Sequence, residues 1–536
     1  MLQLRPLSSL AKVFLDEAPT DEIFSGCSFL RGEEVSFQIA FCSDREDAVF
    51  PEITGEGCEA FWVENIPAGN ACGENADDYF LRRTPGLYPD LLRPATAPKQ
   101  IKKDEWHSLW ITRDSGVSQE IHVRLGGEEV RLRFACIPAE LPEQTLLCTH
   151  WLHYDCLAQA YGTEAFSEAH WEIIENYVRC AVAHGTNLLF TPLFTPPLDT
   201  AIGGERLTIQ LVDVLEEPAG VYRFDFGKLE RWFAMGRRCG AKAYELSHLF
   251  TQWGAKHAPK IIVNGARRFG WDTDADSPAY TDFLTQFGAS LMRFLAAHDL
   301  TERCYAHVSD EPSLDDIEMY ARKAALIQKI FPGVKRIDAL SDYAFYERGL
   351  IERPIPSNNA IAPFIGHVPE LWTYYCCGER THYVSNRFFA MPSERNRVLG
   401  LQLWKFRCAG FLHWAFNFWN AQFSTRAIDP FTCTDAGGGF PSGDPFLVYP
   451  GNGGRPLCSL RLKVFHEALQ DMRALQLLER LIGYDDTLHV LEEGLETPLT
   501  FSAYPHSAAW LLDARARVNR MISAKISACI LSQNTI

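Results

Sequence analysis

The first 140 residues alternate between apolar and polar side chains with the period of two that half-buried strands show. The clearest run has one apolar face, formed by Val35, Phe37, Ile39 and Phe41. Further strands are predicted over residues 108–112, 120–125 and 128–134, with Gly126-Gly127 as a hairpin turn between the last two. We therefore predict an N-terminal antiparallel β-sandwich that ends near residue 140, where Pro138 and Pro142 interrupt sheet ladders.

After Pro142 the pattern changes to a repeat of short apolar strand, polar loop and amphipathic helix. Eight strand candidates occur at residues 145–151, 187–190, 241–246, 304–308, 336–340, 360–365, 382–385 and 410–415. Eight strand-helix units over a segment of this length are typical of a (β/α)8 barrel of the TIM type. We expect this catalytic barrel to span residues 141–482.

Two helices are predicted in the last 80 or so residues of the chain. A helix over residues 460–481 has Leu460, Val464, Ala468, Met472 and Leu475 on one side and is expected to complete the eighth unit. A second helix is predicted over residues 508–526, within a small helical C-terminal extension from 483 to 536. The sequence thus predicts a multidomain protein with a sandwich, a barrel and a helical extension.

Composition narrows the choice of partners. The 51 Lys and Arg residues against 68 Asp and Glu residues give a net charge of −17, which disfavours nucleic acids and anionic membranes as partners. No apolar run approaches the length of a membrane span, and the first 19 residues do not resemble a signal peptide, so a cytoplasmic protein is expected. The 16 cysteines are dispersed and lack C-x-x-C spacing, which argues against both a disulfide scaffold and a zinc site.

Two consecutive acids stand where a predicted strand stops. Asp310 and Glu311 follow the strand at residues 304–308, and Pro312 prevents that strand from continuing. In a parallel barrel, the carboxyl ends of the strands carry the chemistry. Two close carboxylates favour holding one proton between them, as general acid catalysis requires. The alternative is that these acids only cap the helix that begins near Ser313.

A second candidate cluster is rich in aromatic and amide side chains, which suit the apolar face and hydroxyl rim of a sugar. It occupies residues 411–420 and includes Trp414, Asn417 and Trp419, while Trp372, Tyr374, Tyr375 and Trp404 are expected to contribute to the same mouth. The alternative is that these aromatic residues pack the barrel core. His153, His248 and His307 lie near strand ends and are interpreted as hydrogen-bonded structural histidines.

The ordered set of these segments resembles glycoside hydrolase family 123 and the related domain of unknown function 4091 proteins. The resemblance rests on Leu141-Pro142-Glu143, Ser309-Asp310-Glu311-Pro312, Trp372-Thr373-Tyr374, Trp404-Lys405, residues 411–417, Asp429-Pro430 and Tyr449-Pro450-Gly451. It implies a β-sandwich followed by a (β/α)8 barrel, and hydrolysis of β-linked N-acetylgalactosamine with retention of configuration.

By this resemblance, Asp310 orients the 2-acetamido group of the substrate and stabilises an oxazolinium intermediate, and Glu311 is the general acid and base. Trp372, Tyr374, Trp414, Asn417 and Trp419 are the implied substrate contacts, and no metal or organic cofactor is implied. Two other hypotheses stay open from the sequence: a glycosidase for a sugar without the acetamido group, and a carbohydrate-binding protein without turnover.

Overall fold

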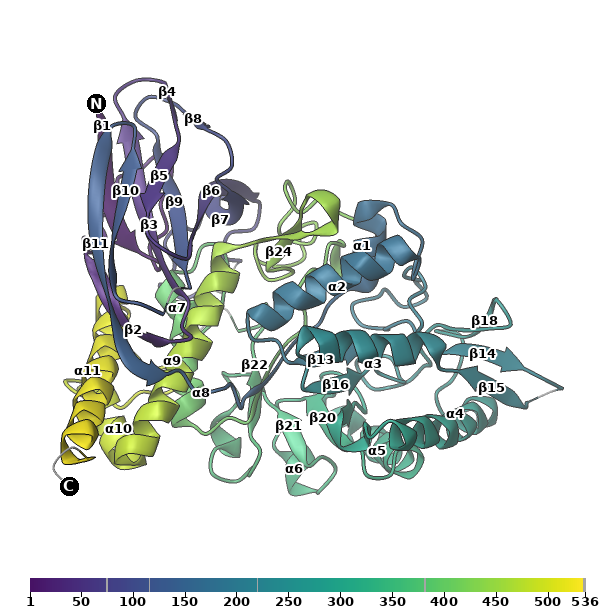
Figure 1. Ribbon diagram of the computed structural model, residues 1–536. Coiled ribbons are helices and arrows are strands. Elements are labelled where there is room, and N and C mark those ends of the chain that lie inside the picture. The colour runs from purple at the N-terminus through teal and green to yellow at the C-terminus, as the bar shows by residue number, and fades with distance from the viewer. Residues whose placement is uncertain (74–75, 115, 219, 380–381, 534–536) are drawn as a thin grey trace.

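The computed structural model describes residues 1–73, 76–114, 116–218, 220–379 and 382–533. An N-terminal sheet domain stands beside a larger α/β region, and the C-terminal helices lie along the boundary between them (Figure 1). The chain is therefore multidomain, with antiparallel sheet first and mixed helix and strand afterwards.

The N-terminal domain has two main sheets. The first has the order β1 (Leu2–Ser8), β3 (Val35–Ser43), β9 (Trp106–Arg113), β6 (Cys58–Ala68) and β7 (Gly86–Pro94), and it is antiparallel throughout. The second has the order β2 (Gly26–Arg31), β11 (Glu128–Glu140), β10 (Gln119–Leu125) and β5 (Pro51–Thr54). A short pair, β4 (Asp47–Val49) with β8 (Lys99–Ile101), completes the domain. The predicted strands of this region are confirmed.

The two sheets face each other across one apolar core. Phe37, Ile39 and Phe41 of β3 are fully buried against residues of β10 and β11 such as Ile121 and Phe134. The hairpin turn at Gly126-Gly127 is confirmed, since both residues have positive φ and Leu125 pairs with Glu128. Two details differ from the prediction. β11 pairs with β2 in parallel, and it continues past Pro138 to Glu140 through a register shift.

Eight parallel strands form the centre of the α/β region. β12 (Leu147–His150), β23 (Gly410–His413) and β22 (Trp372–Tyr374) form one sheet. β13 (Leu188–Thr191), β16 (Ala243–Leu246), β19 (Cys304–Ala306), β20 (Lys335–Ala339) and β21 (Arg353–Ile355) form the other. The sheets meet twice: Asn187 N donates to Cys148 O (3.0 Å), and Tyr374 N donates to Pro356 O (3.2 Å).

Six of the eight predicted strands are found, with ends that differ by a few residues. The other two are wrong. Residues 360–365 contain a 3-10 turn at Ala362–Phe364 instead of a strand, because Pro363 withdraws a backbone donor, and residues 382–385 have no regular structure. The strands at these places in the order are β21 and β22, each three residues long.

Helices follow most of the parallel strands, while the last two helices pack on other helices and on the sheet domain. The helices are α1 (Tyr154–Tyr161), α2 (Glu168–Ala183), α3 (Gly227–Cys239), α4 (Pro278–Ala297), α5 (Ile317–Ile330), α6 (Ala344–Glu347), α7 (Ser393–Arg397), α8 (Leu399–Lys405), α9 (Leu460–Ile482), α10 (Tyr484–Glu492) and α11 (Ala508–Gln533). Both predicted C-terminal helices are present, as α9 and α11. Three hairpins are inserted in loops: β14 (Asp213–Glu216) with β15 (Tyr222–Asp225), β17 (Ile261–Val263) with β18 (Ala266–Phe269), and β24 (Val448–Pro450) with β25 (Pro456–Cys458). Among the described residues, no helix is long and apolar enough to cross a membrane.

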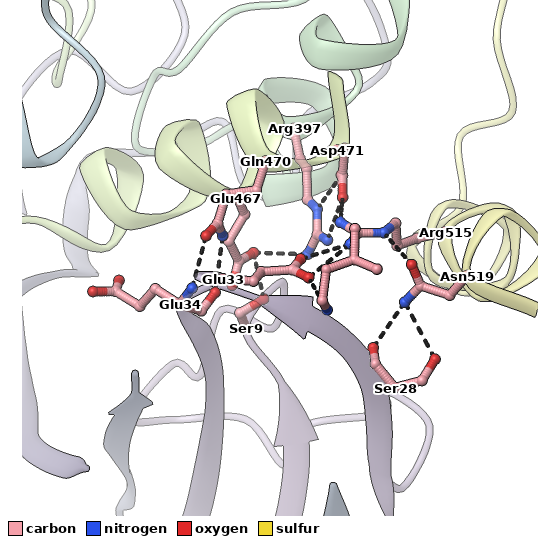
Figure 2. A network of polar contacts seen from close by, with 11 residues as sticks. Ser9, Ser28, Glu33, Glu34, Arg397, Glu467, Gln470, Asp471, Arg515 and Asn519 are labelled. Carbon is pink, nitrogen blue, oxygen red and sulfur yellow. Dashed lines mark hydrogen bonds and ion pairs between the residues drawn. The ribbon is translucent and has the colours of Figure 1, made fainter. Parts of the chain in front are cut away.

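A buried ion network joins the sheet domain to the helices α7, α9 and α11 (Figure 2). Arg397 of α7 binds Glu467 (2.7 Å) and Asp471 (2.7 Å) of α9. Arg515 of α11 binds the same Asp471 (2.8 Å) and Glu33 (2.7 Å), which lies between β2 and β3. Each buried charge thus has an opposite charge in contact, and the network fixes the C-terminal helix against the sandwich.

Candidate active site

Asp310 and Glu311 lie in a sharp turn between β19 and α5. Glu311 has a φ of 45°, a left-handed conformation that a residue with a side chain adopts only when its surroundings enforce it. Its N–H donates to the carbonyl of Ala339 at the end of β20 (2.9 Å), and the carbonyl of Asp310 accepts from Trp253 N (3.2 Å). The backbone therefore leaves the extended form at this point, which turns both carboxylates toward one cavity.

That cavity has a volume of about 270 Å3, near the lower end of the size range of small-molecule sites. Several of its walls come from the carboxyl ends of parallel strands: Trp151 follows β12, Ala339 ends β20, Tyr374 ends β22 and Trp414 follows β23. The remaining lining residues are Leu198, Asp199, Gln252, Trp253, Asp310, Glu311, Cys376, Cys377, Leu412, Gln422, Phe423 and Phe440. The two acids thus face a pocket where parallel α/β proteins bind their ligands.

The two carboxylates have different surroundings. Asp310 is half-buried, and burial, together with the charge of neighbouring Glu311, raises its pKa well above the ordinary value. Glu311 is more exposed, and its Oε1 accepts a hydrogen bond from the Tyr374 hydroxyl (2.6 Å). The pair therefore favours a state with one proton and one negative charge, and the hydrogen bond from Tyr374 holds the Glu311 carboxyl group in place.

A buried charged layer lies beneath the two acids. His307 of the β19 end contacts Glu245 through Nε2 (2.5 Å) and Asp338 through Nδ1 (3.0 Å). Burial opposes protonation of His307, but the hydrogen bonds to both carboxylates outweigh it and raise the His307 pKa to about 10. The imidazole is therefore positively charged at neutral pH, and this charge works against the rise in the pKa of Asp310.

Other contacts hold this layer in position. Glu245 accepts from Trp151 Nε1 (2.7 Å) and from Thr149 Oγ1 (2.7 Å). Asp338 accepts from the Tyr320 hydroxyl (2.6 Å) and from Val308 N (3.0 Å). Because Trp151 also lines the cavity, the layer positions a wall of the pocket as well as the charge below it.

The three histidines near strand ends differ from one another. His153 is hydrogen-bonded through Nε2 to Trp414 O (3.0 Å) and through Nδ1 to Arg206 (3.0 Å), as a structural histidine should be. His307 is also fully hydrogen-bonded. The prediction fails for His248, since neither ring nitrogen has a hydrogen-bond partner among the described residues. His248 instead stacks on His307 at 4.0 Å, and burial lowers its pKa well below the ordinary value.

The sequence-predicted aromatic and amide residues separate into two groups. Tyr374 and Trp414 line the cavity. Trp372 is buried in the interior of the parallel sheets, beside Tyr305. Asn417 forms a double hydrogen bond with the backbone of His153, and Trp419 donates to Val448 O (3.2 Å).

We therefore keep Tyr374 and Trp414 in the candidate site and assign Trp372, Asn417 and Trp419 to the packed core that supports it. Two further residues expected at the mouth lie elsewhere. Tyr375 is fully buried and donates to Asn396 (3.2 Å), and Trp404 donates to Glu479 of α9 (2.9 Å).

Three of the pocket residues that sequence reasoning missed lie together. Trp253 and Phe423 are exposed aromatics whose rings meet edge to face at 6.0 Å on the rim. Asp199 links this rim, because its Oδ2 accepts from Phe423 N (3.1 Å), and burial raises its pKa to about 6. These residues come from three separate loops, and no local pattern marks them. Trp151, in contrast, is the last residue of the strand predicted at 145–151. The strand-end pattern that pointed to Asp310 could therefore have identified Trp151 as well.

Two adjacent acids, one proton between them and a rim of exposed aromatic rings suit general acid catalysis on a sugar. The site thus has the groups that acid-catalysed cleavage of a glycoside requires.

Comparison with known proteins identifies the family. The model of the glycoside hydrolase 123 catalytic domain matches residues 151–478, which is more than half of the chain, and the protein belongs to this family. No curated protein sequence matches the chain.

A family 123 glycoside hydrolase from Clostridium perfringens, studied for glycolipid glycan hydrolysis, shares the fold over 100% of both chains, with a TM-score of 0.75 and 15% identity. Two other hydrolases match with much lower TM-scores. A family 2 member from Bacteroides cellulosilyticus has 9% identity and a TM-score of 0.28 over 82% of this chain and 49% of its own. A family 5 mannosidase from Rhizomucor miehei has 11% identity and a TM-score of 0.34 over 62% and 95%.

Proposed function

We propose that this protein is a retaining β-N-acetylgalactosaminidase that uses the 2-acetamido group of its substrate as the nucleophile. Asp310 orients that group, and Glu311 transfers the protons. Tyr374 and Trp414 contact the sugar. A carbohydrate with a terminal β-linked amino sugar is the substrate class.

The adjacency of the two carboxylates carries this proposal. Retaining enzymes with a protein nucleophile hold two carboxyl groups about 5 Å apart, flanking the sugar from opposite faces. Consecutive residues have Cα atoms only ~3.8 Å apart, and the turn at Glu311 directs both side chains into the same cavity. Such a pair is suited to serve the acetamido group and the leaving oxygen of one bound sugar.

The chemistry takes place in two steps. The proton of the pair has to lie on Glu311 when the sugar is bound, with Asp310 ionised and stabilised by the positive charge of His307. The acetamido oxygen then attacks C1 while Glu311 gives its proton to the leaving oxygen, so that the C1–O bond breaks and an oxazolinium ion forms. Glu311, now a carboxylate, removes a proton from a water molecule that attacks C1 and reopens the ring. Asp310 stabilises the positive charge of the intermediate. The products are the free sugar with retained configuration and the released alcohol.

The relative from Clostridium perfringens suggests where such a sugar is found. We propose the terminal residue of a glycolipid glycan, or of an oligosaccharide derived from one, as the substrate. The cavity of about 270 Å3 is in keeping with a site that encloses one sugar ring and leaves the rest of the glycan outside.

We also propose that the eight parallel strands form one closed (β/α)8 barrel. In its support, β12 and β23, the first and last strands of the set, pair in parallel, and the other strands follow in chain order. The proposed domain limits are 1–140 for the sandwich, 141–482 for the barrel and 483–536 for the C-terminal extension.

The experiment that tests this function follows the anomer first released from a nitrophenyl β-N-acetylgalactosaminide by proton NMR, with and without a thiazoline analogue of the oxazolinium ion. We expect the β-anomer to appear first and the thiazoline to inhibit competitively. Release of the α-anomer, or an active enzyme that the thiazoline does not inhibit, would contradict substrate assistance. The matching glucosaminide, measured in parallel, reports the preference between the two sugars.

A further inference from the structure

Two cysteines and one histidine lie close together at the end of α2 and the start of α9, outside the catalytic cavity. Cys180 and His184 are one turn apart at the C-terminal end of α2, and Cys458 is the last residue of β25, directly before α9. One ligand atom from each lies within 4.8 Å of the others. The Cys180 and Cys458 sulfur atoms are 3.8 Å apart, and the Cys180 sulfur is 3.9 Å from His184 Nδ1.

We propose that Cys180, Cys458 and His184 bind one zinc ion. Zinc bonds to sulfur at about 2.3 Å and to histidine nitrogen at about 2.0–2.1 Å in tetrahedral geometry, which places two sulfurs about 3.8 Å apart and sulfur and nitrogen about 3.6 Å apart. The two cysteines already have this spacing, and the 3.9 Å between the Cys180 sulfur and His184 Nδ1 differs from the expected spacing by a few tenths of an ångström.

Zinc binds cysteine as the thiolate and histidine through a neutral ring nitrogen. Two thiolates and one Zn2+ carry no net charge, which reduces the cost of burying the ion.

The fourth ligand position has a candidate. His466 of α9 lies with its ring centre 5.6 Å from that of His184 and nearly perpendicular to it. Its Nδ1 atom is buried and has no hydrogen-bond partner among the described residues. A water molecule is the alternative. His184 Nδ1 contacts the carbonyl of Cys180 (2.7 Å), and zinc would replace this hydrogen bond with a stronger interaction.

A second group with metal-ligating side chains, His248, His307 and Asp338, is a weaker candidate. Both nitrogens of His307 already contact carboxylates, and both oxygens of Asp338 accept hydrogen bonds. A metal there would have to break several of these bonds. The cysteine cluster has fewer competing partners, because its main contacts are between its own members.

The zinc site would act as a structural link. It would connect α2, the long helix after the first parallel strand, to the start of α9, the long helix after the last. Lys463 beside it pairs with Glu34 of the sheet domain (3.0 Å), so the link lies close to the domain boundary. The inference is independent of the proposed function, since the ligands do not line the catalytic cavity.

The test uses the full chain, reduced and stripped of metal with a chelator. Cobalt(II) is added as a spectroscopic probe, and zinc is then used to displace it. We expect one equivalent of cobalt to give thiolate-to-metal charge-transfer absorption and the strong visible bands of a tetrahedral site. Cys180→Ser and Cys458→Ser should weaken binding by more than the roughly 10- to 100-fold that loss of a supporting residue costs. Cys58→Ser, a half-buried cysteine of the sheet domain, is the matched control and should bind as wild type does.

A second measurement avoids dependence on variants that fold poorly. In the wild-type chain, one equivalent of zinc should slow alkylation of Cys180 and Cys458 at least tenfold, mapped by peptide mass spectrometry, and leave Cys58 unchanged. The proposal is overturned if the reduced chain shows no charge-transfer absorption and no protection. It is also overturned if both serine variants bind like wild type, or if the two cysteines only form a disulfide and bind no metal once reduced.

Discussion

The protein contains two groups of neighbouring acids whose surroundings differ. At the boundary between the sheet domain and the C-terminal helices, Glu33, Glu467 and Asp471 contact Arg397 or Arg515 (Figure 2). At the cavity, the side chains of Asp310 and Glu311 have no Arg or Lys partner among the described residues, and Glu311 is held by a tyrosine hydroxyl.

This difference separates acids that hold parts of the fold together from acids that can transfer a proton. An acid paired with arginine fixes the position of two elements. At Asp471 the two arginines outweigh burial and lower the pKa, whereas at Glu467 burial outweighs Arg397 and raises the pKa to about 7. An acid beside another acid keeps a proton available near neutral pH. The nearest positive charge at the cavity, on His307, is held between two other carboxylates and does not contact Glu311. The comparison predicts that mutations at the cavity reduce activity and mutations at the boundary reduce stability.

The largest effect is expected for Glu311→Gln. It removes the proton donor, and loss of general acid and base catalysis typically costs about 10²- to 10⁴-fold in rate. We expect kcat/KM on a nitrophenyl amino-sugar glycoside to fall within or beyond this range, with an unchanged melting temperature. Glu318→Gln, an exposed acid on α5, is the control and should retain full activity. An active Glu311→Gln enzyme would remove this residue from the mechanism.

Arg397→Met, at the domain boundary, should reduce stability and leave activity unchanged. The substitution leaves Glu467 and Asp471 without their shared partner, and breaking a buried ion pair costs about 3–5 kcal/mol. Urea unfolding should show this loss, with kcat/KM unchanged for the folded fraction. Arg348→Met removes an exposed pair with Glu318 and should cost no more than about 1 kcal/mol. Equal losses in the two variants would contradict the account of the boundary.

His307 lies between two carboxylates next to the cavity, and its contribution to the stability of the fold should depend on pH. Its pKa is raised in the folded state from 6.5 to about 10, so its contribution to stability is fully present below pH 6.5 and is lost between pH 6.5 and about 10. The wild type should lose up to about 1.4 kcal/mol per pH unit more than His307→Gln in this window. Unfolding free energies measured at several pH values test this, and parallel curves for the two proteins would contradict a charged His307.

The smallest effect is expected for Tyr374→Phe, because it removes one hydrogen bond to Glu311 and leaves both acids in place. A hydrogen bond to a charged group contributes about 1.5–3 kcal/mol, so kcat/KM should fall by about 10- to 100-fold. Tyr375→Phe is a matched control, since that hydroxyl bonds Asn396 and faces away from the cavity. Equal effects of the two substitutions would show that Tyr374 acts only through packing.

The sequence allowed the two acids of the cavity to be singled out because a strand pattern stops directly before Asp310 and a proline follows Glu311. The sandwich strands were predictable for a similar reason, since alternation over five or more residues is a strong signal. β21 and β22 were not, because strands of three residues are too short to show a period. The strand predicted at 360–365 was an apolar run that a 3-10 turn also accommodates.

The pocket walls were harder to predict than the acids. Trp372, Trp414 and Trp419 are equivalent in a sequence, yet only Trp414 lines the cavity, because the direction of each side chain depends on tertiary packing. Asp199, Trp253 and Phe423 come from separate loops that meet only in the folded chain. The contact of α11 with the sandwich likewise depends on partners such as Glu33 and Arg515, which are 482 residues apart.

The most direct test of the central claim is nitrophenol release from the β-N-acetylgalactosaminide by wild type, Asp310→Asn and Glu311→Gln, with Arg397→Met measured alongside. The account predicts turnover by the wild type and by folded Arg397→Met, and its collapse in both variants of the acid pair at unchanged melting temperature. No turnover by folded wild type, or full activity in either acid variant, would contradict it.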